Sequence, residues 1–255
     1  MNTPNKFDVN NYQFNKESRD GIYIIHGFTN TTYEVKELAI YLSKQGYYTR
    51  ADNLPGHGTS PEDCNRCKYS DWIEFVEQGM AEMISRCDNI YVIGISMGSL
   101  LALHLSSIFP LNAAVYASIA IKFKDKIRVR ILTPLFHRII PFHQKKYSYP
   151  KYLWDNFEYI GYSVWPLSAV NEMRKLTNYV SSELSSVTCP SLLIHSNADK
   201  LTLKENIEFV YQNISSEQKE TFFIENATHN IFIPSPDREL IFEKVASFLK
   251  QFWKG

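Results

Sequence analysis

The sequence predicts an α/β protein with a mostly parallel central sheet, helices on both faces of that sheet and a small helical insertion. Short β-branched apolar runs alternate with amphipathic helical segments along most of the chain, and one stretch, residues 122–184, lacks such a run. Strands and helices that alternate in this order form a parallel sheet, because a right-handed crossover brings each new strand beside an earlier one.

Buried strands are predicted where a short apolar run stands between turn residues. Continuous apolar runs of this length are typical of parallel strands that are covered on both faces. Six segments have this character: residues 21–25, 47–51, 90–93, 113–121, 191–196 and 221–224.

Helices are predicted between these strands. In residues 33–45 apolar side chains recur every three or four positions, and Gly46 stands where a helix C-cap residue belongs. The final helix is expected to begin at Ser235-Pro236, since these residues supply a cap and a first-turn proline. Similar spacing predicts two further helices, around residues 70–84 and 207–211.

The chain is expected to form one core domain with an inserted cap. A chain of 255 residues can bury a single sizeable core, so its length does not demand two domains. We assign residues 1–121 and 185–255 to the α/β core. The intervening residues 122–184 are rich in Tyr, Trp, Pro, Lys and Arg, and we assign them to the cap.

The charge balance argues against nucleic acid as a partner. Lys plus Arg and Asp plus Glu total 27 each, so no net cationic field is available for a phosphate backbone. The sequence shows no signal-peptide pattern, and its four cysteines are too scattered for a disulfide framework, so we expect a cytoplasmic protein. Cys64-Asn-Arg-Cys67 has no second pair to complete a zinc site, and no metal is expected.

Ser96 is the predicted nucleophile. The motif Gly94-Ile-Ser-Met-Gly98 follows an apolar strand directly and precedes a leucine-rich helix. A serine at the apex of such a strand–turn–helix junction has an exposed hydroxyl in a strained backbone, and the flanking glycines avoid clashes with neighbouring main chain. The helix N-terminus also favours negative charge that develops there.

The general base is predicted to be His229. A serine hydroxyl is a poor nucleophile at neutral pH and needs an imidazole to accept its proton. His229 lies in a predicted loop between the last strand and the last helix, where its side chain can reach Ser96, whereas His195 falls within a strand and His104 within a helix. The histidines that follow Ser96 are His104, His137, His143, His195 and His229.

Asp199 is the predicted acid that orients the imidazole. It stands just beyond the carboxyl end of a predicted strand, the edge where catalytic groups gather in α/β sheets. Glu225 and Asp237 remain alternatives, although Glu225 falls at a strand end and Asp237 in the first turn of a helix.

The oxyanion hole is predicted from two main-chain N–H groups, those of Phe28 and Met97. Met97 follows the nucleophile directly, and Phe28 lies in the loop that ends the first predicted strand. Two preorganised donors stabilise the oxyanion of a tetrahedral intermediate. His26, Gly27 and Phe28 are expected to line the substrate-binding site, with the Phe28 ring as a wall of the pocket.

With these segments in view, the chain resembles the α/β-hydrolase carboxylesterases, near the bacterial carboxylesterase and monoacylglycerol-lipase-like branch. The resemblance implies that Ser96 is acylated, that an alcohol leaves with a proton from His229 and that water then releases the acid. It implies no metal and no organic cofactor. The matching segments are Ile25-His-Gly-Phe-Thr29, Leu54-Pro-Gly-His-Gly-Thr59, Asp71-Trp72, Gly94-Ile-Ser-Met-Gly98, Asp199 and Thr228-His229.

The expected function is hydrolysis of short- to medium-chain carboxylic esters, with monoacylglycerols among the candidate substrates. A thioesterase, an amidase or a C–C bond hydrolase would use the same triad, so these remain alternatives within the fold. A non-catalytic α/β-hydrolase-fold protein that binds a small ligand is the alternative from another class. The sequence predicts a small-molecule ester as the partner of the site.

A basic segment within the predicted cap suggests a second partner. Residues 122–151 contain nine Lys or Arg and a single acid, Asp125, interleaved with apolar side chains. One hypothesis is that this surface approaches anionic lipid or an acidic substrate. The alternative is a solvated helical face on which lysine stems cover apolar surface.

Overall fold

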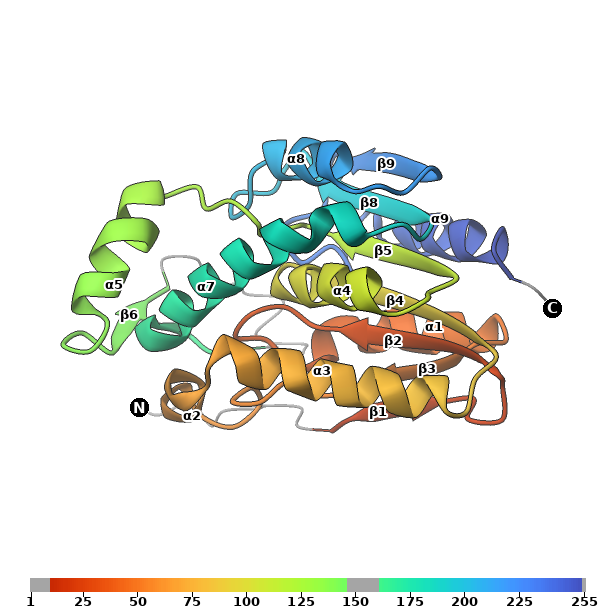
Figure 1. Cartoon of the computed structure of the whole chain (residues 1–255), viewed down its shortest axis with the longest axis horizontal. Coiled ribbons are helices and arrows are strands. Elements are labelled where there is room, and N and C mark those ends of the chain that lie inside the picture. The colour runs from red at the N-terminus through yellow and green to blue at the C-terminus, as the bar shows by residue number, and fades with distance from the viewer. Residues whose placement is uncertain (1–9, 146–160, 254–255) are drawn as a thin grey trace.

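A seven-stranded sheet forms the centre of the protein (Figure 1), in a computed structural model that describes residues 10–145 and 161–253. The strand order is β1-β3-β2-β4-β5-β8-β9, and β1 alone runs antiparallel to its neighbour in this sheet. The predicted α/β fold with a mostly parallel sheet is therefore confirmed. The strands are β1 (Tyr12–Phe14), β2 (Asp20–Ile25), β3 (Tyr48–Ala51), β4 (Asn89–Ile95), β5 (Ala113–Ala117), β8 (Ser191–Ser196) and β9 (Lys219–Ile224).

Two details of the sheet differ from the sequence prediction. β5 ends at Ala117 instead of continuing to residue 121, because Ser118 adopts a φ of 48° and turns the chain out of the sheet. β1 was not predicted, since three residues are too few to show a strand period. Its pairing with β3 decides its conformation.

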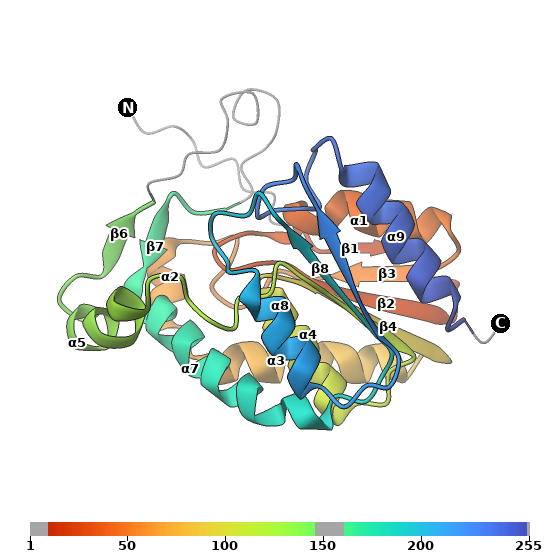
Figure 2. The ribbon, with the colours of Figure 1, turned by 90° about the horizontal axis from the view of Figure 1, so that it is seen from above.

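Helices cover both faces of the sheet (Figure 2). The side chains of β2 alternate between these two layers: Ile22 and Ile24 pack in the core under α1 and α9, whereas Tyr23 and Ile25 pack in the core on the opposite face. Both faces are buried, which explains why the strands are continuously apolar. One face carries α1 (Lys36–Lys44) and α9 (Arg238–Lys250), and the other carries α3 (Tyr69–Ile84), α4 (Met97–Ile108), α7 (Leu167–Glu183) and α8 (Glu205–Asn213).

Residues 122–145 and 161–184 contain short elements followed by the long helix α7. Strand β6 (Phe142–Gln144) pairs antiparallel with β7 (Val164–Pro166), and both are largely exposed or half-buried, so no buried-strand pattern marks them in the sequence. The buried face of α7 packs into the core beside α4. The division into an α/β core and an inserted cap stays a prediction. The remaining short elements are η1 (Thr32–Val35), α2 (Pro61–Arg66), η2 (Arg128–Leu132), α5 (Thr133–Phe136) and η3 (Leu184–Ser186).

The final helix begins later than its sequence predicts. α9 starts at Arg238, and the Arg238 N–H donates to the Ser235 carbonyl at 3.2 Å, so Ser235-Pro236 forms a turn before the helix. Asp237 accepts hydrogen bonds from the N–H groups of Asn226 and Ala227 at 2.7 and 3.1 Å. The carboxylate thus holds the loop after β9. In the part of the chain that the structure describes, no helix is both long and apolar enough to cross a bilayer.

Candidate active site

Ser96 occupies a sharp turn between β4 and α4. Its backbone angles, φ 57° and ψ −116°, lie where L-residues are strained, and such strain persists only where the surroundings hold it. The Ser96 N–H donates to the Ala117 carbonyl at the end of β5 at 2.9 Å. The residue is 8% exposed, so its hydroxyl lies in a confined site at the carboxyl edge of the sheet.

The glycines around Ser96 permit this turn. A Cβ on Gly94 would lie 2.1 Å from the Gly98 carbonyl oxygen, and a Cβ on Gly98 would lie 2.2 Å from the Ile25 carbonyl oxygen. Both separations are far shorter than a non-bonded contact. Glycine is therefore required at both positions for β2, β4 and α4 to approach one another as closely as they do.

His229 and Asp199 form a hydrogen-bonded pair. His229 Nδ1 lies 2.7 Å from Asp199 Oδ2, and the Asp199 carboxylate also accepts from the Leu201 N–H at 2.7 Å and the Thr202 hydroxyl at 2.5 Å. Burial opposes ionisation of this carboxyl, but the bonds from His229 and Thr202 outweigh it and hold the pKa of Asp199 well below its usual range. An ionised carboxylate only accepts hydrogen bonds, so Nδ1 carries the imidazole proton and Nε2 keeps its lone pair.

The end of β5 brings the serine loop and the histidine loop together. Ser118, directly after Ala117, donates its hydroxyl to the His229 carbonyl at 2.8 Å. Ala117 accepts from the Ser96 N–H, so two consecutive residues tie down both loops. This role of Ser118 could not be predicted from sequence patterns, because the contact joins positions that are 111 residues apart.

The alternative acids make other contacts. Glu225 accepts a hydrogen bond from the Asn197 side chain at 2.7 Å and lies on the exposed surface. Asp237 holds the main chain of the loop that leads to His229. Among the three acids weighed from the sequence, Asp199 alone bonds the imidazole.

The other histidines have packing or surface positions. His104 is buried in α4 between the carboxylates of Glu77 and Glu183, at 2.9 and 2.8 Å, and so links α3, α4 and α7. His195 is buried within β8, and burial lowers its pKa. His137 contacts the Ser168 hydroxyl at 2.9 Å.

The loop after β2 is held from within by a buried carboxylate. Glu34 Oε2 accepts from the Gly27 N–H and Glu34 Oε1 from the Asn30 side-chain amide, each at 2.6 Å. Burial raises the pKa of Glu34, and the two donors partly offset that effect. Sequence reasoning missed Glu34, because an acidic residue before an amphipathic helix usually faces solvent.

His26 supports this loop with both ring nitrogens. Its Nε2 accepts from the Leu54 N–H at 3.1 Å, so Nδ1 carries the proton and donates to the Gly27 carbonyl at 2.9 Å. Burial lowers the pKa of His26 to about 4, which keeps the ring neutral. Both ring nitrogens of His26 are therefore hydrogen-bonded to main chain, one of them to the Gly27 carbonyl that precedes Phe28.

Phe28 joins the loop to an aromatic cluster. Its ring stacks on Trp165 at a centroid distance of 6.1 Å and an interplanar angle of 10°, and it meets Trp72 and His57 edge-on. In the part of the chain that the structure describes, neither the Phe28 N–H nor the Met97 N–H donates to a protein acceptor. Both groups are therefore free to bind an oxygen atom of a ligand.

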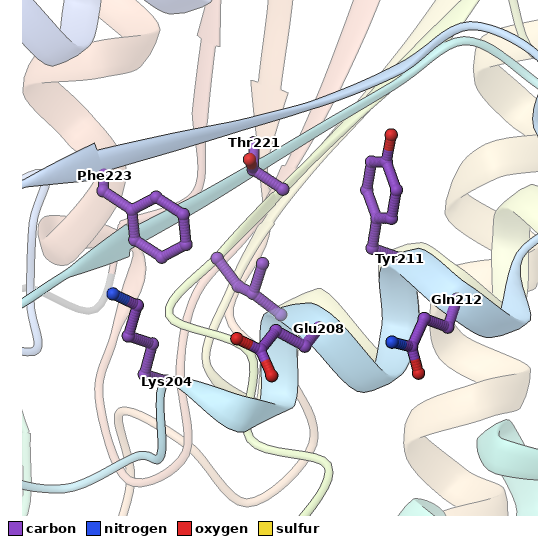
Figure 3. A pocket seen from close by; sticks show the side chains of 7 residues that line it. Lys204, Glu208, Tyr211, Gln212, Thr221 and Phe223 are labelled. Atoms are coloured by element: carbon purple, nitrogen blue, oxygen red, sulfur yellow. The ribbon is translucent and has the colours of Figure 1, made fainter.

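A pocket of about 350 Å³ lies elsewhere, between α8 and β9 (Figure 3). None of the sequence-predicted site residues lines it. Because it lies beside the edge strand β9 and not at the turn that carries Ser96, we do not assign the chemistry to it. Its lining residues are Lys204, Ile207, Glu208, Tyr211, Gln212, Thr221 and Phe223.

The match to known proteins agrees with this geometry. A family model described as serine aminopeptidase, S33, matches residues 16–235. The chain belongs to this serine aminopeptidase S33 family. The match includes all strands of the seven-stranded sheet except β1, as well as the region predicted to be the cap.

Named relatives of this S33 family member are lipases and esterases. The chain is 28% identical to a thermostable monoacylglycerol lipase of Bacillus sp. strain H-257, with 89% of each protein covered. It is 22% identical to a carboxylesterase of Bacillus subtilis strain 168, with 90% of this chain and 92% of the relative covered. The structure of a metagenome-derived lipolytic enzyme superposes with a TM-score of 0.85 at 24% identity, covering 98% of this chain and all of that one. The α/β-hydrolase fold and the predicted resemblance to this group are confirmed.

Proposed function

We propose that this protein hydrolyses carboxylic esters through an acyl intermediate on Ser96. The observation that carries the proposal is the 2.7 Å bond between His229 Nδ1 and Asp199 Oδ2. It leaves Nε2 as the free base of an imidazole whose loop is tied to that of the serine. The names of the lipase and esterase relatives support the same reaction class.

The proposed reaction has two steps. His229 Nε2 accepts the Ser96 proton while Oγ attacks the ester carbonyl carbon, and the N–H groups of Phe28 and Met97 bind the oxyanion that forms. The carbon–oxygen bond to the alcohol then breaks, and His229 returns the proton to the leaving oxygen. A water oxygen then attacks the acyl carbon while the same imidazole accepts the water proton. The bond to Ser96 Oγ breaks, His229 returns the proton to Oγ, and the acid is released.

The proposed substrates are short- to medium-chain esters, including monoacylglycerols. The half-buried Trp165 ring stacks on Phe28, whose N–H is one of the proposed oxyanion donors, and we propose that this ring contacts the acyl chain. Cleavage of amides is the second candidate, and the name of the matching family model, serine aminopeptidase, favours it. Gly27 and Phe28 would line the site, with His26 holding their main chain.

A substrate panel tests this proposal. We expect p-nitrophenyl esters of rising chain length and a monoacylglycerol to be hydrolysed, with kcat/KM highest at short or medium acyl chains. Amino-acid p-nitroanilides, assayed in parallel, report peptidase activity. Turnover of the anilides but not the esters would make the amide the substrate, and failure of a fluorophosphonate probe to label the native protein would indicate a binding protein.

We also propose that the predicted cap, residues 122–184, contacts anionic membranes. Seven of the fourteen exposed large apolar side chains among the described residues fall between positions 127 and 140. Basic side chains alternate with them, including the exposed Lys126, Arg130 and Arg138. Exposed apolar groups bounded by cations are typical of surfaces that insert between acidic lipid headgroups. The seven are Ile127, Ile131, Leu132, Leu135, Phe136, Ile139 and Ile140.

Vesicle binding measures this contact. We expect the protein to sediment with vesicles that contain phosphatidylglycerol but weakly with neutral phosphatidylcholine vesicles, and salt should reduce the binding because it screens the charges. A triple charge reversal, Lys126→Glu, Arg130→Glu and Arg138→Glu, should abolish sedimentation while leaving hydrolysis of p-nitrophenyl acetate unchanged. Equal binding of the native protein to both vesicle types, or none to either, would contradict an electrostatic lipid contact and favour a solvated face.

The cytoplasm is the proposed location. The four cysteines are all free, and Cys64, Cys87 and Cys189 are buried, an arrangement that suits a reducing compartment. Immunodetection after fractionation of the source cells is the measurement that tests it.

A further inference from the structure

Lys145 is a half-buried lysine that no step of the proposed reaction uses. It follows β6 directly, and its main-chain N–H donates to the Ser163 carbonyl at 3.1 Å, which continues the pairing with the chain before β7. We propose that Lys145 is a positioning residue for the oxyanion hole, which holds the main chain of Phe28 from the β6–β7 side. The inference rests on the proposed function, since the Phe28 N–H is an oxyanion donor only if that function holds.

Two sets of contacts connect the Lys145 ammonium to Phe28. In the first, Nζ donates to Thr29 Oγ1 at 2.6 Å, and the Thr29 hydroxyl donates to the Phe28 carbonyl at 2.6 Å. In the second, Nζ lies 4.4 Å from the centre of the Trp165 ring, and Trp165 stacks on the Phe28 ring. One cation therefore restrains both the main chain and the side chain of Phe28.

The loop needs such restraint because its backbone is strained. Thr29 has a φ of 63°, a conformation that costs a β-branched residue free energy and persists only when neighbouring contacts enforce it. The Tyr162 N–H donates to the Thr29 carbonyl at 2.8 Å, and Asn30 forms a bridge with Gly161. Lys145 bonds the Thr29 side chain, so residues next to both β6 and β7 restrain the same turn.

Charge gives Lys145 a second effect on the site. The Glu34 carboxylate bonds the Gly27 N–H within this loop, and a buried negative charge there opposes the negative charge that develops on the substrate oxygen. Lys145 and Glu34 attract one another, and the attraction favours the charged form of each. The positive charge of the Lys145 ammonium thus offsets the negative charge of the Glu34 carboxylate near the proposed oxyanion donors.

Protonation of Lys145 should make this support pH-dependent. Burial lowers the pKa of Lys145 to about 7, and the attraction of Glu34 only partly offsets that effect. The other titratable groups that face the ammonium are His57, whose pKa burial lowers to about 3, and Cys64, whose pKa burial raises. His57 and Cys64 are both uncharged near neutral pH. Among these groups, only Lys145 therefore changes its charge as the pH rises through 7.

Three variants separate this role from a general effect on folding. Lys145→Met keeps an apolar side chain of similar length without the ammonium, and Lys145→Arg keeps a cation that is permanent in the assay range. Lys44→Met removes an exposed lysine in the last turn of α1, outside both the loop after β2 and the basic segment, and serves as the matched control. The measurements are amide hydrogen exchange of the peptide that spans residues 26–31, and kcat and KM for p-nitrophenyl acetate between pH 5.5 and 9.

We expect Lys145→Met to exchange the amides of residues 26–31 about tenfold faster, with exchange in β5 unchanged. Its kcat should fall about 10–100-fold with KM nearly constant, because a misplaced oxyanion donor acts on the transition state. The native kcat should decline above pH 7, and the two Lys145 variants should lack that decline. Lys145→Arg should recover most of the native kcat, and Lys44→Met should match the native protein throughout.

Native exchange and native kcat in Lys145→Met would overturn the proposal. A rise in KM at unchanged kcat would also overturn it, because Lys145 would then contact substrate and not the loop. The exchange measurement needs no turnover, so it tests the restraint of the loop even if the native protein fails to react with a fluorophosphonate. Failure of the proposed function and failure of this inference therefore give different results.

Discussion

Ser96→Ala should abolish ester hydrolysis and covalent labelling by a fluorophosphonate probe. The reaction depends on a bond between Ser96 Oγ and the acyl carbon, and alanine offers no atom that can form it. We expect kcat to fall roughly 10⁵–10⁶-fold, the range seen when the nucleophile of a catalytic triad is removed. The measurement is the initial rate with a p-nitrophenyl ester, with in-gel fluorescence for the probe.

Ser107→Ala is the matched control for this variant. Ser107 lies in the same helix as the residues after the nucleophile, and its hydroxyl donates to the His104 carbonyl at 2.7 Å, away from the turn. We expect native labelling and a native rate. Persistence of labelling in Ser96→Ala would assign the nucleophile to another residue, and equal loss in both variants would point to a folding defect in α4.

Asp199→Asn should lower kcat about 10⁴-fold while leaving the fold intact, since the change is nearly isosteric. The carboxylate accepts from His229 Nδ1, which places the proton on Nδ1 and the free lone pair on Nε2. An asparagine can turn its NH₂ group toward the ring and stabilise the other tautomer, in which Nε2 can no longer accept the Ser96 proton. Since the pKa of Asp199 lies well below its usual range, the native carboxylate is ionised throughout an assay between pH 5 and 9, so pH alone will not mimic this loss.

Glu225→Gln is the control for the choice of acid. Glu225 is one of the alternatives in the sequence, and its carboxylate contacts the exposed side chain of Asn197. We expect kcat within a factor of about two of the native value, as for most exposed substitutions away from a network. A large loss in Glu225→Gln together with a small one in Asp199→Asn would reverse the assignment of the acid.

Part of the candidate site could be predicted from local patterns. The strand before Ser96, the leucine-rich helix after it and the flanking glycines all lie within a few positions, and the steric need for those glycines is visible in the structure. His229 was expected in a loop between the last strand and the last helix, and it lies in the loop between β9 and α9. Both predictions rest on backbone geometry that neighbouring residues impose.

The support around the site could not be predicted in this way. Glu34 binds the Gly27 N–H from within a buried turn, and Thr202 donates to Asp199 after a short bend. Glu and Thr side chains normally face water or cap helices. No pattern in the sequence distinguishes Glu34 and Thr202 from the other Glu and Thr residues of the chain. Glu34 and Thr202 support the site because the fold buries the polar atoms that they bond, away from water.

By itself, the sequence determined the six parallel strands of the main sheet, the strained turn at Ser96 and the loop that carries His229, because hydrophobic period and turn chemistry act over a few residues. Only the tertiary structure decided that Asp199, and not Glu225 or Asp237, bonds His229, and that Lys145 bonds Thr29 across 116 positions. Such contacts form only when elements that are distant in the chain pack against one another, and this packing depends on the side chains of the whole core.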